Sequence, residues 1–261
     1  MQDLLTGTAA GVPWVARPPQ DGPRPEAPAV VAWHLLDSPR TEAALAAAVP
    51  LDGLDAWRIY FGLPLSGARL PAGGYAELQE RAMRDPVLDL YVEVAGGAVA
   101  EFPGALAAVR NQLGIHDGPI GVLGGSLGGL VAQWVAAESG LDIRAAVLIN
   151  PVVRLRDTID GLSAQEGRTY AWYPEASAFA DRADFVARAA ELMDTAVLMI
   201  TGEKDFEDAI VRPAGAAVAE YQRLGVPADW QVIPGMAHAV ADEPAVQIDR
   251  LAASWFTRYL L

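Results

Sequence analysis

The stretch that decides the fold is residues 120–128, Ile-Gly-Val-Leu-Gly-Gly-Ser-Leu-Gly, which opens an uncharged run of 18 residues ending at Ala137. That run is as long as a membrane-spanning segment. It nevertheless carries five glycines, Ser126 and Gln133, and it follows a Gly118-Pro119 turn. These features predict a buried strand over 120–123, a tight glycine turn and a helix over 126–138.

The alternation of strand and helix continues on both sides of this stretch. Runs rich in apolar residues predict strands at 29–33, 57–61, 143–149, 196–200 and 229–233, with an edge strand near 11–17. Helical patterns lie between them at 41–49, 75–84, 99–113 (interrupted at Pro103), 212–224 and 245–260. The pattern predicts an α/β fold, a mostly parallel sheet with helices on both faces, in a single domain over 1–261.

Residues 152–190 break this rhythm. They are polar at first and then aromatic, with Trp172 and Tyr173 at the centre of the aromatic part. We expect a short cap inserted between two strands, in which Trp172 and Tyr173 line a substrate pocket. The alternative is that these rings only pack the segment down onto the domain.

The composition excludes several classes of function. Apolar residues make up 52% of the chain and charged residues 20%, which is typical of a globular protein. The net charge of −14 would repel nucleic acid and anionic membrane surfaces, so we expect a small-molecule partner. No cysteine is present, which excludes disulfides and a cysteine nucleophile. The N-terminus lacks the pattern of a signal peptide, and we expect a cytoplasmic location.

Ser126 lies in Gly124-Gly125-Ser126-Leu127-Gly128, a G-x-S-x-G motif between a predicted strand and a predicted helix. A sharp, strained turn at this place lifts the serine hydroxyl above the sheet, and the glycines let the strand and the helix approach each other. The free N–H groups of the helix point at the same site. The motif therefore predicts a nucleophilic serine, and the alternative is a serine that merely caps the helix.

A serine hydroxyl needs an adjacent base, and the base needs a carboxylate to orient it. His238 follows the strand at 229–233 and is the only histidine C-terminal to Ser126. Asp205 follows the strand at 196–200. Since parallel strands end at one edge of the sheet, we expect the three side chains to meet there. Acidic neighbours of Asp205 are rivals for its role, and Asp205 is preferred because it is nearest to the strand; the rivals are Asp208, Glu203 and Glu207.

A serine that attacks a carbonyl group also needs two N–H groups to bind the oxyanion that develops. The amide of Leu127, which follows the serine, is the first candidate. The second should come from the loop after the strand at 29–33, where we favour Leu36 and keep Leu35 as the alternative. His34 in this loop is assigned to the substrate-binding site, although a structural histidine that bonds its own loop is the competing interpretation.

Together these motifs resemble the α/β-hydrolase superfamily over residues 10–261. The turn at 124–129 is similar to that of the prolyl oligopeptidase and acylaminoacyl peptidase catalytic domains, and Gly202-x-x-Asp205 and Gly235-x-x-His238 fit the same group. The resemblance implies a serine hydrolase with the triad in the order Ser126, Asp205, His238. His34-Leu35 departs from the His-Gly that is common at this place. With 261 residues, the chain also has no room for the propeller of those peptidases, and it resembles dienelactone hydrolases and small carboxylesterases as well.

We therefore predict a serine hydrolase that cleaves a small or medium acyl ester through an acyl-enzyme intermediate. The alternatives are an exopeptidase or acyl-peptide hydrolase, and a protein of the same fold that binds a ligand without turnover. No metal or other cofactor is expected, because three scattered histidines and no cysteines offer no zinc-type spacing and no phosphate-binding glycine motif is present. The sequence carries no signal for an oligomeric state.

Overall fold

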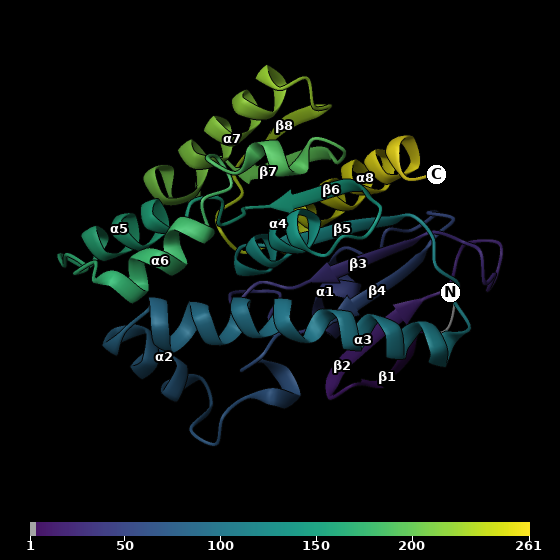
Figure 1. Ribbon diagram of the computed structural model, residues 1–261, viewed down its shortest axis with the longest axis horizontal. Helices are drawn as coiled ribbons and strands as arrows, with labels where there is room; N and C mark the ends of the chain where they lie inside the picture. The colour runs from purple at the N-terminus through teal and green to yellow at the C-terminus, as the bar shows by residue number, and fades with distance from the viewer. Residues whose placement is uncertain (1–3) are drawn as a thin grey trace.

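A computed structural model describes residues 4–261, and its centre is an eight-stranded sheet in the order β1-β2-β4-β3-β5-β6-β7-β8 (Figure 1). The strand β2 pairs antiparallel with β1 and β4, and all other neighbours are parallel. The predicted mostly parallel sheet is confirmed. The strands are β1 (Leu5–Ala9), β2 (Val12–Arg17), β3 (Ala29–Trp33), β4 (Trp57–Phe61), β5 (Ile120–Gly125), β6 (Ile143–Ile149), β7 (Ala196–Gly202) and β8 (Ala228–Ile233).

Helices cover both faces of this sheet. On one face α1 (Glu42–Ala48) and α8 (Asp242–Tyr259) bury their apolar sides against the strands, including Leu45, Ile248 and Phe256. In α8 the buried positions recur every three or four residues, which is the spacing of one helical face. The other face carries the larger core beneath α3 (Gly97–Leu113), α4 (Leu127–Glu138) and α7 (Arg212–Arg223). The predicted α/β architecture with two covered faces is thus present.

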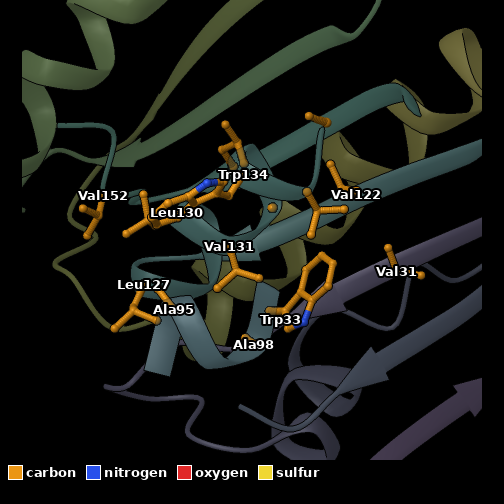
Figure 2. Close-up of a cluster of buried hydrophobic side chains, with 14 of the residues drawn as sticks. Val31, Trp33, Ala95, Ala98, Val122, Leu127, Leu130, Val131, Trp134 and Val152 are labelled. Carbon is orange, nitrogen blue, oxygen red and sulfur yellow. The ribbon is translucent and has the colours of Figure 1, made fainter. Parts of the chain in front are cut away.

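The uncharged run at 120–137 forms β5 and most of α4, as the glycines predicted. A different segment, Val87–Leu113, is by length and composition apolar enough to cross a membrane. In this fold it packs against α4: Ala95 and Ala98 lie beside Leu127 and Val131 in the cluster of buried side chains drawn in Figure 2. Core helices of folded domains can pass the same test of length and composition, and 39% of this apolar window is buried in the structure.

The helix expected at 99–113 is not interrupted at Pro103. It continues from a π-helical segment, η2 (Val87–Gly96), into α3 and runs through the proline to Leu113. Proline removes a hydrogen bond and costs about 3 kcal/mol in a helix interior. Phe102 and Leu106 on either side of it are almost fully buried, and each such side chain contributes roughly 1.5–3 kcal/mol. Core packing therefore outweighs the local penalty.

The sequence did not reveal β1. It forms a hairpin with β2 through Ala10 and Gly11, both of which have positive φ angles, 49° and 85°. Two successive positive φ angles are typical of the tight turn that suits a hairpin, and Asn-Gly or Asp-Gly is its usual sequence. Alanine at the first position hides that signal.

The segment expected as a cap contains α5 (Leu155–Gln165) and α6 (Pro174–Arg182) and runs into the short η3 (Ala189–Leu192). Figure 1 shows α5 and α6 together beyond the end toward which the arrow of β6 points, with α2 (Gly74–Arg84) nearby. The hydroxyl of Thr158 in α5 donates to the carbonyl of Ala209, 2.9 Å away, in η4 (Glu207–Val211). Helices α5 and α6 therefore lie above the carboxyl ends of the strands. A further short turn, η1 (Gly67–Arg69), precedes α2.

Candidate active site

Ser126 occupies a strained turn between β5 and α4. Its backbone has φ 50° and ψ −117°, a region that residues other than glycine seldom adopt. The turn is possible because a Cβ atom on Gly124 would lie 2.1 Å from the carbonyl oxygen of Gly128, and one on Gly128 would lie 2.4 Å from that of Trp33. The two glycines let β5, α4 and the end of β3 come together at the serine, which is 8% exposed.

His238 and Asp205 meet Ser126 at this edge of the sheet. The His238 Nε2 atom lies 2.8 Å from Ser126 Oγ, and His238 Nδ1 lies 3.0 Å from both carboxylate oxygens of Asp205. An ionised carboxylate only accepts hydrogen bonds, so Nδ1 carries the proton and Nε2 is free to accept the serine proton. The Asp205 side chain is fully buried and that of His238 is 16% exposed. The three side chains form a continuous hydrogen-bonded chain from Ser126 Oγ through the His238 ring to Asp205.

The rival carboxylates lie elsewhere. Asp208 is exposed and pairs with Arg212 one turn along the chain. Glu203 is exposed and accepts the backbone N–H of Gly235 at 2.8 Å, which ties the loop after β7 to the loop after β8. Glu207 is an exposed residue of η4. Among the candidates from the sequence, the structure brings Asp205 to the histidine.

The loop after β3 lies directly against the turn at Ser126. A Cβ atom on Gly125 would come within 2.2 Å of the Leu35 side chain. The Leu35 N–H donates to the carbonyl of Pro39 at 3.2 Å and is thus engaged within its own loop. Within residues 4–261, the amides of Leu36 and Leu127 have no hydrogen-bond acceptor. That the amides of Leu127 and Leu36 bind an oxyanion stays a prediction.

His34 does not fit the expectation that it contacts substrate. It is fully buried, its Nδ1 donates to the carbonyl of Leu35 at 2.6 Å, and its Nε2 accepts the N–H of Leu63 at 3.1 Å. Burial lowers the pKa of His34 from 6.5 to about 4. Both ring nitrogens are used inside the protein, so His34 is a structural residue that connects the loop after β3 to the loop after β4.

Trp172 and Tyr173 are not brought to the three central residues by any hydrogen bond or ring contact in the described part of the chain. The indole N–H of Trp172 donates to Asp160 at 2.8 Å, and its ring lies 4.2 Å below the guanidinium of Arg156. Tyr173 lines a cavity of about 270 Å³ between the α5–α6 connection and the end of α2. A role for either ring in substrate binding stays a prediction.

A cavity of about 360 Å³ lies next to the loop after β3. It is lined by Leu36, Arg40, Tyr75, Leu78, Gln79 and Leu90. A larger cavity of about 630 Å³ is bordered by His116, at the amino end of β5, and includes none of the three central residues. No cluster of three or more His, Asp or Glu side chains within residues 4–261 is arranged to hold a metal ion.

Sequence reasoning passed over two residues at the site. The Phe206 ring lies 5.6 Å from the His238 ring, centroid to centroid, and covers it. Asn150 directly follows β6 and hydrogen-bonds the backbone of His238. Its position was a usable signal, because a polar residue at the carboxyl end of a buried strand is the same pattern that identified Ser126 and Asp205.

Comparison with known proteins assigns the chain to a family. The sequence model of the prolyl oligopeptidase family matches residues 93–261, well over half of the chain. A search of curated proteins found no match.

Among solved structures, TT1662 from Thermus thermophilus is similar, with a TM-score of 0.69, 18% identity and 98% of each chain covered. The acylaminoacyl peptidase of Pyrococcus horikoshii has a TM-score of 0.66 and 14% identity over 99% of this chain, which spans 41% of that peptidase. The esterase of Pyrobaculum calidifontis has a TM-score of 0.59 and 21% identity over 98% of this chain and 84% of the esterase. At these identities the structures show a common fold. The chain therefore belongs to the prolyl oligopeptidase family and is a hydrolase with the α/β-hydrolase fold.

Proposed function

We propose that the chain is a serine esterase that cleaves carboxylic esters of small or medium acyl chains through an acyl-enzyme intermediate. The observation that carries the proposal is the hydrogen-bonded path from Ser126 Oγ through the His238 ring to Asp205, with distances of 2.8 and 3.0 Å. A nucleophile within reach of a base, which is itself oriented by a buried carboxylate, is the arrangement that acyl transfer requires.

In the first half-reaction, Ser126 Oγ attacks the ester carbonyl while its proton passes to His238 Nε2. Asp205 stabilises the imidazolium that forms. The negative charge that develops on the carbonyl oxygen is held by the amides of Leu127 and Leu36, and each such donor is worth about 10²–10³ in rate. His238 then gives the proton to the departing alkoxide, and the alcohol leaves. In the second half-reaction, water gives a proton to His238 Nε2 and attacks the acyl carbon. The bond from that carbon to Ser126 Oγ then breaks, the acid leaves, and His238 returns the proton to Ser126 Oγ.

The size of the acyl group follows from the cavity next to the proposed oxyanion loop. Leu36 lines that cavity, so a carbonyl oxygen bound at its amide would place the attached chain at the entrance. The walls are mainly apolar, with Leu78 and Leu90 as the aliphatic side chains besides Leu36. An apolar cavity of about 360 Å³ suits an acyl chain of moderate length and gains free energy for each methylene that it buries.

Hydrolysis of an acylated peptide is the second candidate, and the match to the prolyl oligopeptidase family favours it. The same groups would serve, with an amine in place of the alcohol as the leaving group. An amine must be protonated to leave, so amide cleavage depends more strongly on proton donation by His238.

The two candidates are separated by a comparison of substrates on the purified chain. We expect p-nitrophenyl esters from acetyl to decanoyl to be hydrolysed with a kcat/KM well above that of aminoacyl anilides, with an optimum at medium chain length. A higher kcat/KM for the anilides would replace the esterase proposal by the peptidase. If neither series is turned over while both bind, the protein is a ligand-binding member of the fold.

A further inference from the structure

Asn150 is a buried polar residue at the carboxyl end of β6 that the proposed reaction does not use. It follows β6, its side chain is fully buried, and its backbone has a positive φ of 43°. Asparagine tolerates this region better than most residues, but the conformation still carries some strain. A buried amide needs partners for its N–H groups and its oxygen, because each unpaired group costs about 1–3 kcal/mol.

The partners of Asn150 are the two loops that carry the base and the acid. Its Nδ2 donates to the carbonyl of Ala237 at 3.1 Å and to that of His238 at 2.9 Å. Its Oδ1 accepts the N–H of Gly202, 2.8 Å away, three residues before Asp205. One side chain therefore uses both of its donors and its acceptor to join the end of β7 to the loop after β8.

The residues that flank Asn150 hold the backbone of the serine. The Ser126 N–H donates to the carbonyl of Ile149 at 2.9 Å, and the N–H of Val152 donates to the Ser126 carbonyl at 3.1 Å. The serine is thus fixed to residues 149–152, and Asn150 in the same segment fixes the histidine. The backbones of Ser126 and His238 are therefore connected through their hydrogen bonds to residues 149–152.

Other contacts join the two loops to each other but do not tie His238 to the serine. Lys204 N–H donates to the carbonyl of Met236, and Gly235 N–H donates to Glu203. Within residues 4–261, the backbone of His238 makes its hydrogen bond to Asn150. We propose that Asn150 is a positioning residue that sets the distance between Ser126 Oγ and His238 Nε2. The inference rests on the proposed function, because it concerns the base of that reaction.

Two substitutions separate the hydrogen bonds of Asn150 from its shape. Asn150→Ala removes all three side-chain hydrogen bonds. Asn150→Asp keeps the shape, but an ionised carboxylate has no N–H to donate and would face the carbonyl oxygens of Ala237 and His238. If only the shape of the side chain mattered, Asn150→Asp would keep the kcat that Asn150→Ala loses. The proposed role requires kcat to fall in both variants.

The matched control is Thr195→Val. Thr195 is buried just before β7 and donates its hydroxyl to the carbonyl of Ile143 at 2.7 Å, at the opposite end of the same pair of strands. The substitution Thr195→Val also removes a buried hydrogen bond from these strands, but at the end of the sheet opposite to the serine. It therefore reports the effect of lost stability alone.

The experiment measures kcat and KM for a p-nitrophenyl ester, and the rate of Ser126 modification by a fluorophosphonate, in all variants. Both rates are taken per folded molecule, with the folded fraction from circular dichroism well below the melting temperature. A misplacement of about 1 Å can cost about 10² in rate. For Asn150→Ala and Asn150→Asp we expect kcat and the modification rate to fall together by about tenfold to a hundredfold, with KM unchanged within about twofold. For Thr195→Val we expect both rates to stay at the wild-type value.

Wild-type rates per folded molecule in both Asn150 variants would overturn the inference, and so would wild-type kcat restored by Asp. If the Ala variant does not fold, the Asp variant and Asn150→Ser, which keeps a small polar side chain, decide the matter on the same scale. A wild-type chain that neither hydrolyses esters nor reacts with the fluorophosphonate would overturn the proposed function and this inference with it. An active, labelled wild type with unaffected Asn150 variants would overturn the inference alone.

Discussion

Ser126 Oγ and His238 Nε2 lie 2.8 Å apart although 112 positions separate the two residues in the chain. The sheet order explains how they meet. Their strands, β5 and β8, are separated by β6 and β7, whose carboxyl ends carry Asn150 and Asp205. Four neighbouring strand ends therefore supply, in spatial order, the residues proposed as nucleophile, positioning residue, acid and base. The loop after β8 reaches back across two strands to place His238 at the serine.

Replacement of Ser126 by alanine should abolish ester hydrolysis. Without the hydroxyl no acyl-enzyme can form, and loss of the nucleophile in a serine protease costs about 2 × 10⁶ in kcat. We expect a loss of at least about 10⁴ in kcat for p-nitrophenyl acetate. The control is Ser139→Ala at the other end of α4, where the one hydrogen bond of the hydroxyl within residues 4–261 is accepted from the N–H of Leu141. An Ser126→Ala protein with activity comparable to that of the control would show that the reaction takes place elsewhere.

Replacement of Asp205 by asparagine should lower kcat by about 10³–10⁴, because the neutral amide no longer holds His238 in the right tautomer. Asp208→Asn is the matched control, since Asp208 is three positions away and exposed. We expect that variant to keep the wild-type kcat. The reverse result, a large loss with Asp208→Asn alone, would assign the acid to Asp208.

The sequence was enough to predict most of the fold and the three central residues, because both depend on patterns local to the chain. Ser126, Asp205 and His238 each follow a strand, and parallel strands end at one edge of the sheet. The position of the serine hydroxyl could also be predicted, because the strained turn that presents it needs the glycines of the G-x-S-x-G motif.

The features that could not be predicted from the sequence depend on contacts between residues that are far apart in the chain. The sequence around His34 does not indicate that its two ring nitrogens form hydrogen bonds with the backbone of Leu35 and with that of Leu63, 29 positions away. The continuity of the helix through Pro103 depends on tertiary packing that outweighs local propensity. Asn150 was visible as a polar residue after a strand, but its partners Gly202 and His238 lie 52 and 88 positions further on.

Stability should fall as the solution is acidified because of His34. The pKa of this histidine is about 4 in the folded protein, lowered by burial, and near 6.5 when the chain is unfolded. Between these two pH values the His34 ring is protonated in the unfolded chain but not in the folded protein. The free energy of unfolding therefore decreases as the pH falls from about 6.5 to about 4. Since one pH unit of pKa difference is worth about 1.4 kcal/mol, the contribution is about 3 kcal/mol.

The measurement is urea unfolding of the wild type and of His34→Asn at several pH values. The variant should be less stable at pH 8, because it loses at least one buried hydrogen bond. Its free energy of unfolding should fall less steeply between pH 6.5 and 4 than that of the wild type. Parallel curves for the two proteins over this range would contradict the assignment of His34 as a buried neutral residue.

Filling the cavity beside Leu36 should shorten the preferred acyl chain. Leu78→Trp places a larger ring among the lining residues, so octanoyl and decanoyl esters should lose about tenfold to a hundredfold in kcat/KM while acetyl esters are unaffected. Glu80→Trp, an exposed position on the same helix that lines neither this cavity nor the one beside Tyr173, is the control. An equal loss for all chain lengths would show that acyl chains bind elsewhere.

The most direct test of the proposed chemistry is reaction of the purified wild-type chain with a fluorophosphonate, followed by mass spectrometry of the peptides. We expect one adduct per chain, located on Ser126, and loss of esterase activity in proportion to the adduct. Protection by a medium-chain ester substrate should slow the labelling. A folded chain that hydrolyses esters but carries no adduct on Ser126, or keeps full activity when Ser126 is modified, would contradict the assignment of Ser126 as the nucleophile.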